Sequence, residues 1–332
     1  MSRSQQNADY LSASNYGVKN KIINGNFDVW QRGTSISVTA SATYTADRYV
    51  AYYDGTGATR TVSRQAFTVG QTDVPYEPRY FLRYAQTVAG SGGTANHFAH
   101  RIEGARTFAG QTVTLSFYAK FASTASINVS AFQVFGTGGS PSGSVQLSFV
   151  TGLSVGTSWT KYTYTATIPS ISGKTFGTNE NDSLDIYFVL PINTTFTFDI
   201  AQIQLEAGSV ATPFEQRPFG MELALCQRYY QVLGVATLAA MRTATTIEFP
   251  IQHAEMRAAP SVTQGSVFTI YNAFGSSFVQ SSASITAPVV SSNSPNGQVI
   301  ALNNFTGLTA GNTCWIANTN YPTASIRLSA EF

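Results

Sequence analysis

The chain has 332 residues, with 19 lysines and arginines against 17 aspartates and glutamates, and its formal net charge is +2. So small a charge provides no basic surface for phosphate groups, which argues against nucleic acid as a partner. Charged residues make up 11% of the chain, whereas an ordinary soluble domain has about 25%. Neutral polar residues and glycine must therefore cover most of the surface, which suits a chain built into an assembly better than a free monomer.

The length predicts two domains, and the patterns along the chain divide it into four stretches. Residues 1–20 are polar and have no hydrophobic periodicity, so this leader is either disordered or extended against a partner, and we expect an extended leader that docks on a partner. This start has no apolar segment typical of a secretory signal. Nowhere do about 18 consecutive apolar residues occur, so we expect no membrane insertion.

Short runs of alternating apolar and polar residues predict β-strands throughout residues 21–217. In residues 112–119, for example, Val113, Leu115 and Phe117 alternate with threonine and serine, as in a strand with one buried face. Further runs, separated by turn residues, lie at 49–53, 127–135, 145–150, 160–168, 184–190 and 196–205. Many short strands without interleaved helices predict an all-β chain that begins with an antiparallel, jelly-roll-like β-sandwich.

Residues 218–234 are the one stretch that predicts a helix, which begins after Pro218 and ends at Gly234. The expected helix has two apolar stripes, one of which consists of Met221, Leu225, Tyr229 and Val232. Such a helix should be buried at an interface, either between the two domains or between copies of the chain. Residues 235–332 return to strand alternation and predict a small C-terminal β-sandwich.

The sequence contains no convincing catalytic motif. The segment from Ser172 to Thr175 resembles the end of a phosphate-binding loop, but Ile168 stands where that motif requires glycine. His97 and His100 would lie on opposite faces of a strand, which argues against a shared metal ion. The three histidines and 17 acidic residues leave a hydrolytic triad or a glycosidase carboxylate pair formally open. Because none of these motifs is convincing, we expect no enzymatic activity. We also expect Cys226 and Cys314 to be buried thiols.

Two long motifs carry a resemblance to a known family. The first reads INGNFDVWQRG at residues 23–33, and the second reads QLEAGSVATPFEQRP at residues 204–218. Together they resemble the tail-fibre and minor virion proteins of bacteriophages and prophages, over residues 20–260. The resemblance implies a sandwich similar to carbohydrate-binding modules, a place on the virion, and other virion proteins as partners. It also implies self-association, with a homotrimer as the expected form.

The same resemblance implies a tail-fibre component that contacts host surface glycan. Sugar rings stack on exposed aromatic side chains beside polar loops. The candidate platforms are Tyr52, Tyr53, Tyr271, Trp315 and Tyr321, each with core packing as its alternative. Tyr52 and Tyr53 are adjacent, so at most one of them should be exposed on a strand. The competing interpretation is a purely structural virion protein, such as a spacer, collar or capsid fibre, that mediates assembly without a receptor.

Charged residues of the first motif and of the Asp47-Arg48 pair predict a structural contact. We expect one bidentate ion pair among Asp28, Arg32, Asp47 and Arg48. Carbohydrate modules of this type often hold a structural Ca²⁺, and the hard oxygens available here belong to Asn26, Asp28 and Asp199. Neighbouring arginines compete for the same carboxylates.

Overall fold

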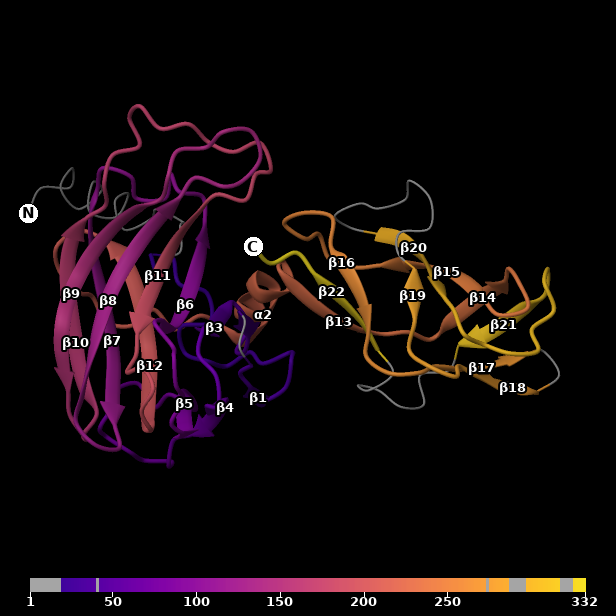
Figure 1. The fold of residues 1–332 in the computed structure, drawn as a ribbon, viewed down its shortest axis with the longest axis horizontal. Helices are drawn as coiled ribbons and strands as arrows, with labels where there is room; N and C mark the ends of the chain where they lie inside the picture. Colours follow the sequence, from indigo (N-terminus) through magenta and orange to yellow (C-terminus); the bar gives the residue numbers. More distant parts are fainter. Residues whose placement is uncertain (1–18, 40–41, 273–274, 287–296, 317–324) are drawn as a thin grey trace, which may run out of the picture. The chain divides into compact units, whose positions relative to one another are not determined.

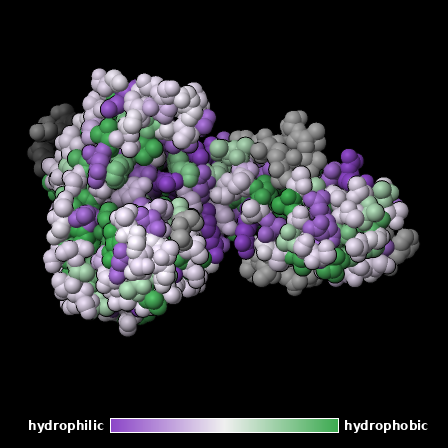
Figure 2. All heavy atoms as spheres, viewed as in Figure 1, coloured by the Kyte–Doolittle hydropathy of each residue, from purple (hydrophilic) through white to green (hydrophobic). Residues whose placement is uncertain are grey.

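The computed structural model describes residues 19–39, 42–272, 275–286, 297–316 and 325–332. The chain forms two compact units, the first ending at Phe219 and the second beginning at Gly220. Nearly all regular elements are antiparallel strands, so the chain is all-β, as predicted. The described residues contain no helix that is both long and apolar enough to cross a membrane. Figure 2 shows one face of the molecule, which is mostly pale because residues of intermediate hydropathy cover it.

Unit 1 is a sandwich of two six-stranded antiparallel sheets (Figure 1). The first sheet has the strand order β1 (Ser35–Ser37), β4 (Thr59–Ala66), β5 (Tyr80–Val88), β12 (Phe196–Ala207), β7 (Thr112–Phe121) and β10 (Thr160–Thr167). The second sheet has the order β2 (Thr43–Tyr44), β3 (Tyr49–Tyr53), β6 (Asn96–Glu103), β11 (Ser183–Val189), β8 (Ala125–Val134) and β9 (Val145–Val155). Non-consecutive strands are neighbours in both sheets, which is the arrangement expected of a jelly-roll-like sandwich.

One apolar core lies between these two sheets. Val113, Leu115 and Phe117 of β7 are all fully buried, which confirms the alternation seen in the sequence. Phe117 meets Phe188 of the opposite sheet edge-to-face, with ring centroids 5.1 Å apart. Each such buried side chain stabilises the fold by about 1.5–3 kcal/mol. Because alternate residues point inward, Ser116 and Tyr118 of the same strand face outward.

The two family-like motifs lie against each other at one side of the sandwich. The Ile203 amide donates to the Gly25 carbonyl at 3.0 Å, and the Lys21 amide donates to the Leu205 carbonyl at 3.0 Å. The Asn20 side chain extends this pairing, since it accepts from the Leu205 amide and donates to the Ile203 carbonyl, both at 3.0 Å. Asn20 therefore belongs to the sandwich, one residue before the predicted domain boundary. Residues 1–18 of the predicted leader lie outside the described residues.

Unit 2 is a small sandwich built from two further antiparallel sheets. A three-stranded sheet has the order β13 (Tyr230–Gly234), β22 (Ser325–Ser329) and β16 (Ser261–Gln264). A seven-stranded sheet has the order β18 (Ser277–Val279), β17 (Thr269–Asn272), β21 (Thr313–Ile316), β14 (Thr237–Met241), β15 (Ile247–Gln252), β20 (Gly297–Leu302) and β19 (Ile285–Thr286). Residues from both sheets, including Leu328 and Ile270, are fully buried in one core.

The helix is shorter than the sequence predicts. Helix α2 spans Phe219–Gln227, and the predicted second half is instead strand β13, in which Tyr230 pairs with Ser329 of β22. Pairing with β22 satisfies the backbone of these aromatic and β-branched residues, and it overrides the helical pattern. Met221 is 50% exposed, Leu225 is half-buried, and Val232 lies in the strand. The four residues Met221, Leu225, Tyr229 and Val232 therefore do not form one helical stripe. Cys226 and Cys314 are buried thiols outside any disulfide, as predicted.

Candidate functional site

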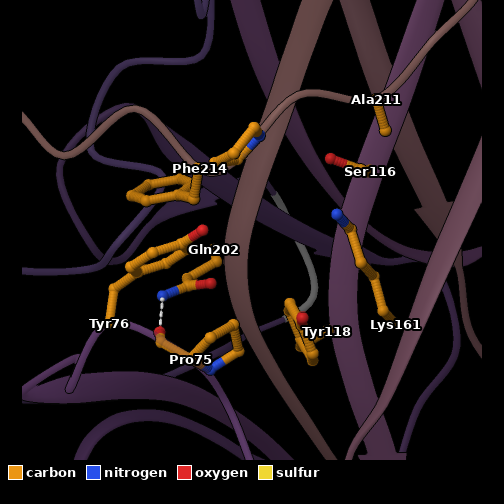
Figure 3. Close-up of a pocket in the computed structure, with 9 residues that line it drawn as sticks. Pro75, Tyr76, Ser116, Tyr118, Lys161, Gln202, Ala211 and Phe214 are labelled. Atoms are coloured by element: carbon orange, nitrogen blue, oxygen red, sulfur yellow. Dashed lines mark hydrogen bonds between the residues drawn. The ribbon is translucent and has the colours of Figure 1, made fainter.

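A cavity of about 210 Å³ lies on the outward face of the first sheet of unit 1 (Figure 3). Three neighbouring strands, one loop and the segment after β12 supply its walls. The lining residues are Ser116 and Tyr118 of β7, Lys161 of β10, Gln202 of β12, Pro75 and Tyr76 of the loop before β5, and Ala211, Pro213 and Phe214. None of these residues was among the predicted site residues.

Three aromatic rings line the cavity. Figure 3 shows Tyr76 and Phe214 on one side, with Tyr118 and Lys161 across from them. Tyr76 is 56% exposed and has a backbone φ of 67°, a left-handed conformation that is uncommon for tyrosine. Burial, followed by the effect of nearby Tyr76, raises the pKa of Tyr118, and its protonated phenol is available as a hydrogen-bond donor. Rings placed in this way can stack on a ligand while the hydroxyls of the two tyrosines form hydrogen bonds.

Gln202 places a polar group at the base of the same cavity. It lies in a β-bulge of β12, where the pairing with β7 shifts between Ala201 and Gln204, and its φ is 49°. Its Nε2 donates to the Pro75 carbonyl at 2.7 Å, which ties the loop before β5 to the sheet. Its Oε1 is buried and has no hydrogen-bond partner. A buried acceptor without a partner costs about 1–3 kcal/mol, which a donor entering the cavity would recover.

The second motif builds the wall that contains Phe214. Outward-facing residues of β12 hold the returning segment, because Glu206 accepts from the Thr212 amide at 2.8 Å and from its hydroxyl at 2.6 Å. Gln204 Oε1 accepts from the Glu215 amide at 2.8 Å. Ile203 and Leu205, which alternate with these residues along β12, face inward and are fully buried in the core. One motif thus supplies the core and positions a cavity wall.

Charged and aromatic residues continue along the outward face beside the cavity. Arg83 of β5 forms a bidentate pair with Asp199 of β12, with Nε–Oδ1 and Nη2–Oδ2 distances of 2.7 and 2.8 Å. Lys120 of β7 has its Nζ 4.0 Å from Asp199 Oδ2 and 5.2 Å from the centre of the Trp159 ring. Trp159 also packs edge-to-face on Phe81, with centroids 5.2 Å apart.

The predicted charged contacts are found in part. Arg32 Nη1 lies 3.2 Å from Asp47 Oδ1, and Asp47 Oδ2 accepts from the Gln31 amide at 2.8 Å. Arg48 is buried and donates to the Arg101 carbonyl. Asp28 accepts from Asn26 at 3.2 Å, and burial raises the pKa of Asp28.

Two of the three predicted calcium ligands, Asp28 and Asp199, have other partners in the structure, whereas Asn26 Oδ1 is buried without one. Because Arg83 holds both oxygens of Asp199, a calcium ion bound to Asn26, Asp28 and Asp199 would have to compete with a guanidinium. Over the described part of the chain, no group of three or more His, Cys, Asp or Glu side chains is placed to hold a metal.

The predicted aromatic platforms differ in accessibility. Tyr53 is fully buried, its hydroxyl donates to Asn193 Oδ1 at 2.6 Å, and the Arg60 guanidinium lies 3.9 Å from its ring centre. It cannot serve as a platform, because loop backbone at Gly55 and Gly90 closes against its ring. Tyr52, the other predicted platform of β3, is half-buried and stacks on the His97 ring, with ring centroids 5.0 Å apart.

In unit 2, Trp315 is 49% exposed. Tyr271, which is half-buried, lies directly opposite Trp315 on the neighbouring strand of the seven-stranded sheet. Tyr321 lies outside the described residues.

No model of a known protein family matches the sequence, and no curated protein matches it at a significant level. Similar solved structures include the enzymatically active domain of tailspike protein 4 from bacteriophage CBA120, at 16% identity and a TM-score of 0.34. That match covers 57% of this chain and 21% of the tailspike chain, so this chain spans about a fifth of its length.

Two carbohydrate-binding modules are similar over nearly their whole length. The CBM22-2 xylan-binding domain of Paenibacillus barcinonensis Xyn10C has 14% identity and a TM-score of 0.32, with 56% of this chain and 98% of that chain covered. The family 11 carbohydrate-binding module of the Clostridium thermocellum cellulase Lic26A-Cel5E has 12% identity and a TM-score of 0.30, with 52% and 95% covered.

Proposed function

We propose that this protein is a non-enzymatic bacteriophage virion component of the tail-fibre type, which binds host surface glycan in the cavity of unit 1. The observation that carries the proposal is the combination of three aromatic rings with the buried, unpaired Oε1 of Gln202 in one small cavity. A sugar presents apolar C–H faces to stack on rings and hydroxyls to donate, so it satisfies both features.

The size of the cavity limits what it holds. Its volume of about 210 Å³ is below the roughly 300–1,000 Å³ of sites for drug-sized ligands, so it suits a single sugar ring. The ring would stack on Tyr118 and donate a hydroxyl to Gln202. Tyr76, which is 56% exposed, would form the outer wall of the site. Neighbouring sugars of a chain would lie along the outward face toward Trp159.

Binding without catalysis is part of the proposal. Hydrolysis of a glycosidic bond commonly requires two carboxyl groups about 5–9.5 Å apart. The cavity lining contains no carboxylate, histidine or cysteine. A sugar held there would therefore meet stacking rings and neutral hydrogen-bonding groups, with one lysine.

The virion setting is supported by the motifs at residues 23–33 and 204–218, which resemble phage tail-fibre proteins. In that setting the partners are other virion proteins and further copies of this chain, as a homotrimer. A second candidate function is a purely structural virion part. The hydrogen bond between Gly25 and Ile203 favours this candidate, because it shows that both motifs have a role in folding that requires no ligand.

The test compares the full-length protein with two cavity variants, Tyr118→Ala and Phe214→Ala, on an array of bacterial surface polysaccharides. We expect each variant to lose about ten-fold in affinity, which corresponds to about 1.4 kcal/mol per stacking contact. Tyr52→Ala is the matched control, because Tyr52 is a half-buried tyrosine on the second sheet. Equal binding by all four proteins would place the glycan outside this cavity, whereas no binding by any of them would favour the structural virion part.

A further inference from the structure

Two rows of residues on the outward face beside the cavity carry an excess of positive charge. Tyr118 pairs in register with Lys161, and two residues along the same strand Lys120 pairs with Asp199, which in turn pairs with Arg83. Residues two apart on a strand share a face, so these two rows lie about 7 Å apart on the outward side. They contain three cations against one carboxylate. These four side chains therefore have a formal charge of +2, which equals the formal charge of the whole chain.

Lys161 is the cation that belongs to the cavity itself. Its side chain is exposed, and none of the described residues forms an ion pair with it. The nearest acidic residues of β12 and the segment after it are already engaged, since Glu206 binds Thr212 and Glu215 accepts from the Asn20 amide at 2.7 Å. In Figure 3 the ammonium group of Lys161 extends along the cavity wall toward Ser116.

From this arrangement we infer that the sugar bound in the cavity carries a carboxylate, as in a hexuronate unit of an acidic polysaccharide. The inference rests on the proposed function and specifies its ligand class. Directly paired residues on neighbouring strands have side chains about 5 Å apart. A sugar ring stacked on Tyr118 therefore places a ring carboxylate within reach of Lys161, while a ring hydroxyl faces Gln202. Lys120 and Arg83 then attract the next acidic unit along the chain.

The experiment uses the full-length protein and three acidic polymers, polygalacturonate, alginate and hyaluronan, each beside its carboxyl-reduced form. Reduction keeps the linkage and removes the charge, so the pair isolates the contribution of the carboxylate. We expect at least one acidic polymer to bind about five-fold more tightly than its reduced form, as for a partly exposed charge pair. This preference should fall as salt is raised from 50 to 500 mM.

Lys161→Gln should reduce the preference to less than two-fold. The matched control is Lys174→Gln, which removes one charge outside the cavity lining and should keep the full preference. A phosphorylated glycan is included, because lysine also binds phosphate. Binding to that glycan but to no carboxylated polymer overturns the inference.

The inference and the proposed function fail in different ways. If acidic and reduced polymers bind equally and Lys161→Gln has no effect, the carboxylate inference is wrong. In that outcome, loss of binding in Tyr118→Ala still supports the proposed sugar site. If neither these polymers nor any glycan of the bacterial polysaccharide array binds, both are wrong.

Discussion

Replacing Gly25 with alanine tests whether the two motifs close the sandwich as described. A Cβ at residue 25 would lie 2.2 Å from the Ile203 carbonyl oxygen, well under the 3.0 Å that real Cβ contacts respect. The backbone must separate by almost 1 Å, but the Gly25 carbonyl is itself hydrogen-bonded to the Ile203 amide at 3.0 Å. Overpacking costs about 1–3 kcal/mol, and the strained hydrogen bond adds about 1 kcal/mol.

We therefore expect Gly25→Ala to lower the free energy of unfolding of unit 1 by about 3 kcal/mol. For a unit of this size each kcal/mol shifts Tm by about 2–4 °C, so the expected decrease is about 6–12 °C. Differential scanning calorimetry and urea unfolding measure the change. Gly143→Ala is the control, because a Cβ there meets nothing within 4 Å and its φ is not in the left-handed region. Equal Tm values for the two variants would refute the close packing of the opening motif on β12.

Three further predictions concern stability. Burial lowers the pKa of His97 to about 4 and that of His100 well below its usual 6.5. Because the unfolded chain binds more protons, stability is complete above pH 6.5 and falls on acidification, and His97 alone contributes a loss of about 2 kcal/mol at pH 5. His97→Gln should flatten this dependence of Tm on pH, and an unchanged slope would count against it. Arg83→Met leaves the buried Asp199 carboxylate with only a distant lysine, so urea unfolding should show a loss of about 1–3 kcal/mol. Tyr53→Phe removes the 2.6 Å hydrogen bond to Asn193 and should cost about 1 kcal/mol, whereas a neutral effect would mean that this bond contributes nothing.

The sequence predicts strands well where apolar and polar residues alternate along the chain. The runs at 112–119 and 196–205 correspond to β7 and β12, because one face of each strand packs in the core. Strand β4 was not predicted, since its sequence TRTVSRQA includes two arginines. Arg60 is nevertheless buried, and its guanidinium lies over the Tyr53 ring. Such a partner belongs to a different strand and is invisible in a local pattern.

The candidate site was harder to predict than the fold. Its walls come from strands β7, β10 and β12 and from two separate loops, so no single segment contains the pattern. Gln202 owes its position to a bulge, which a one-residue shift in pairing creates. Phe214 was the available signal, as an aromatic residue in a polar segment directly after a strand. The family resemblance accounts for its motif without pointing to a cavity.

A crystal structure of the full-length chain with a bound glycan tests the central claim most directly. The glycan would be the one that binds most tightly on the polysaccharide array. The account predicts a sugar ring stacked on Tyr118, with a hydroxyl donating to Gln202 Oε1 and Phe214 on the opposite side. A sugar bound elsewhere, for example on Trp315 of unit 2 with the unit 1 cavity empty, would contradict it.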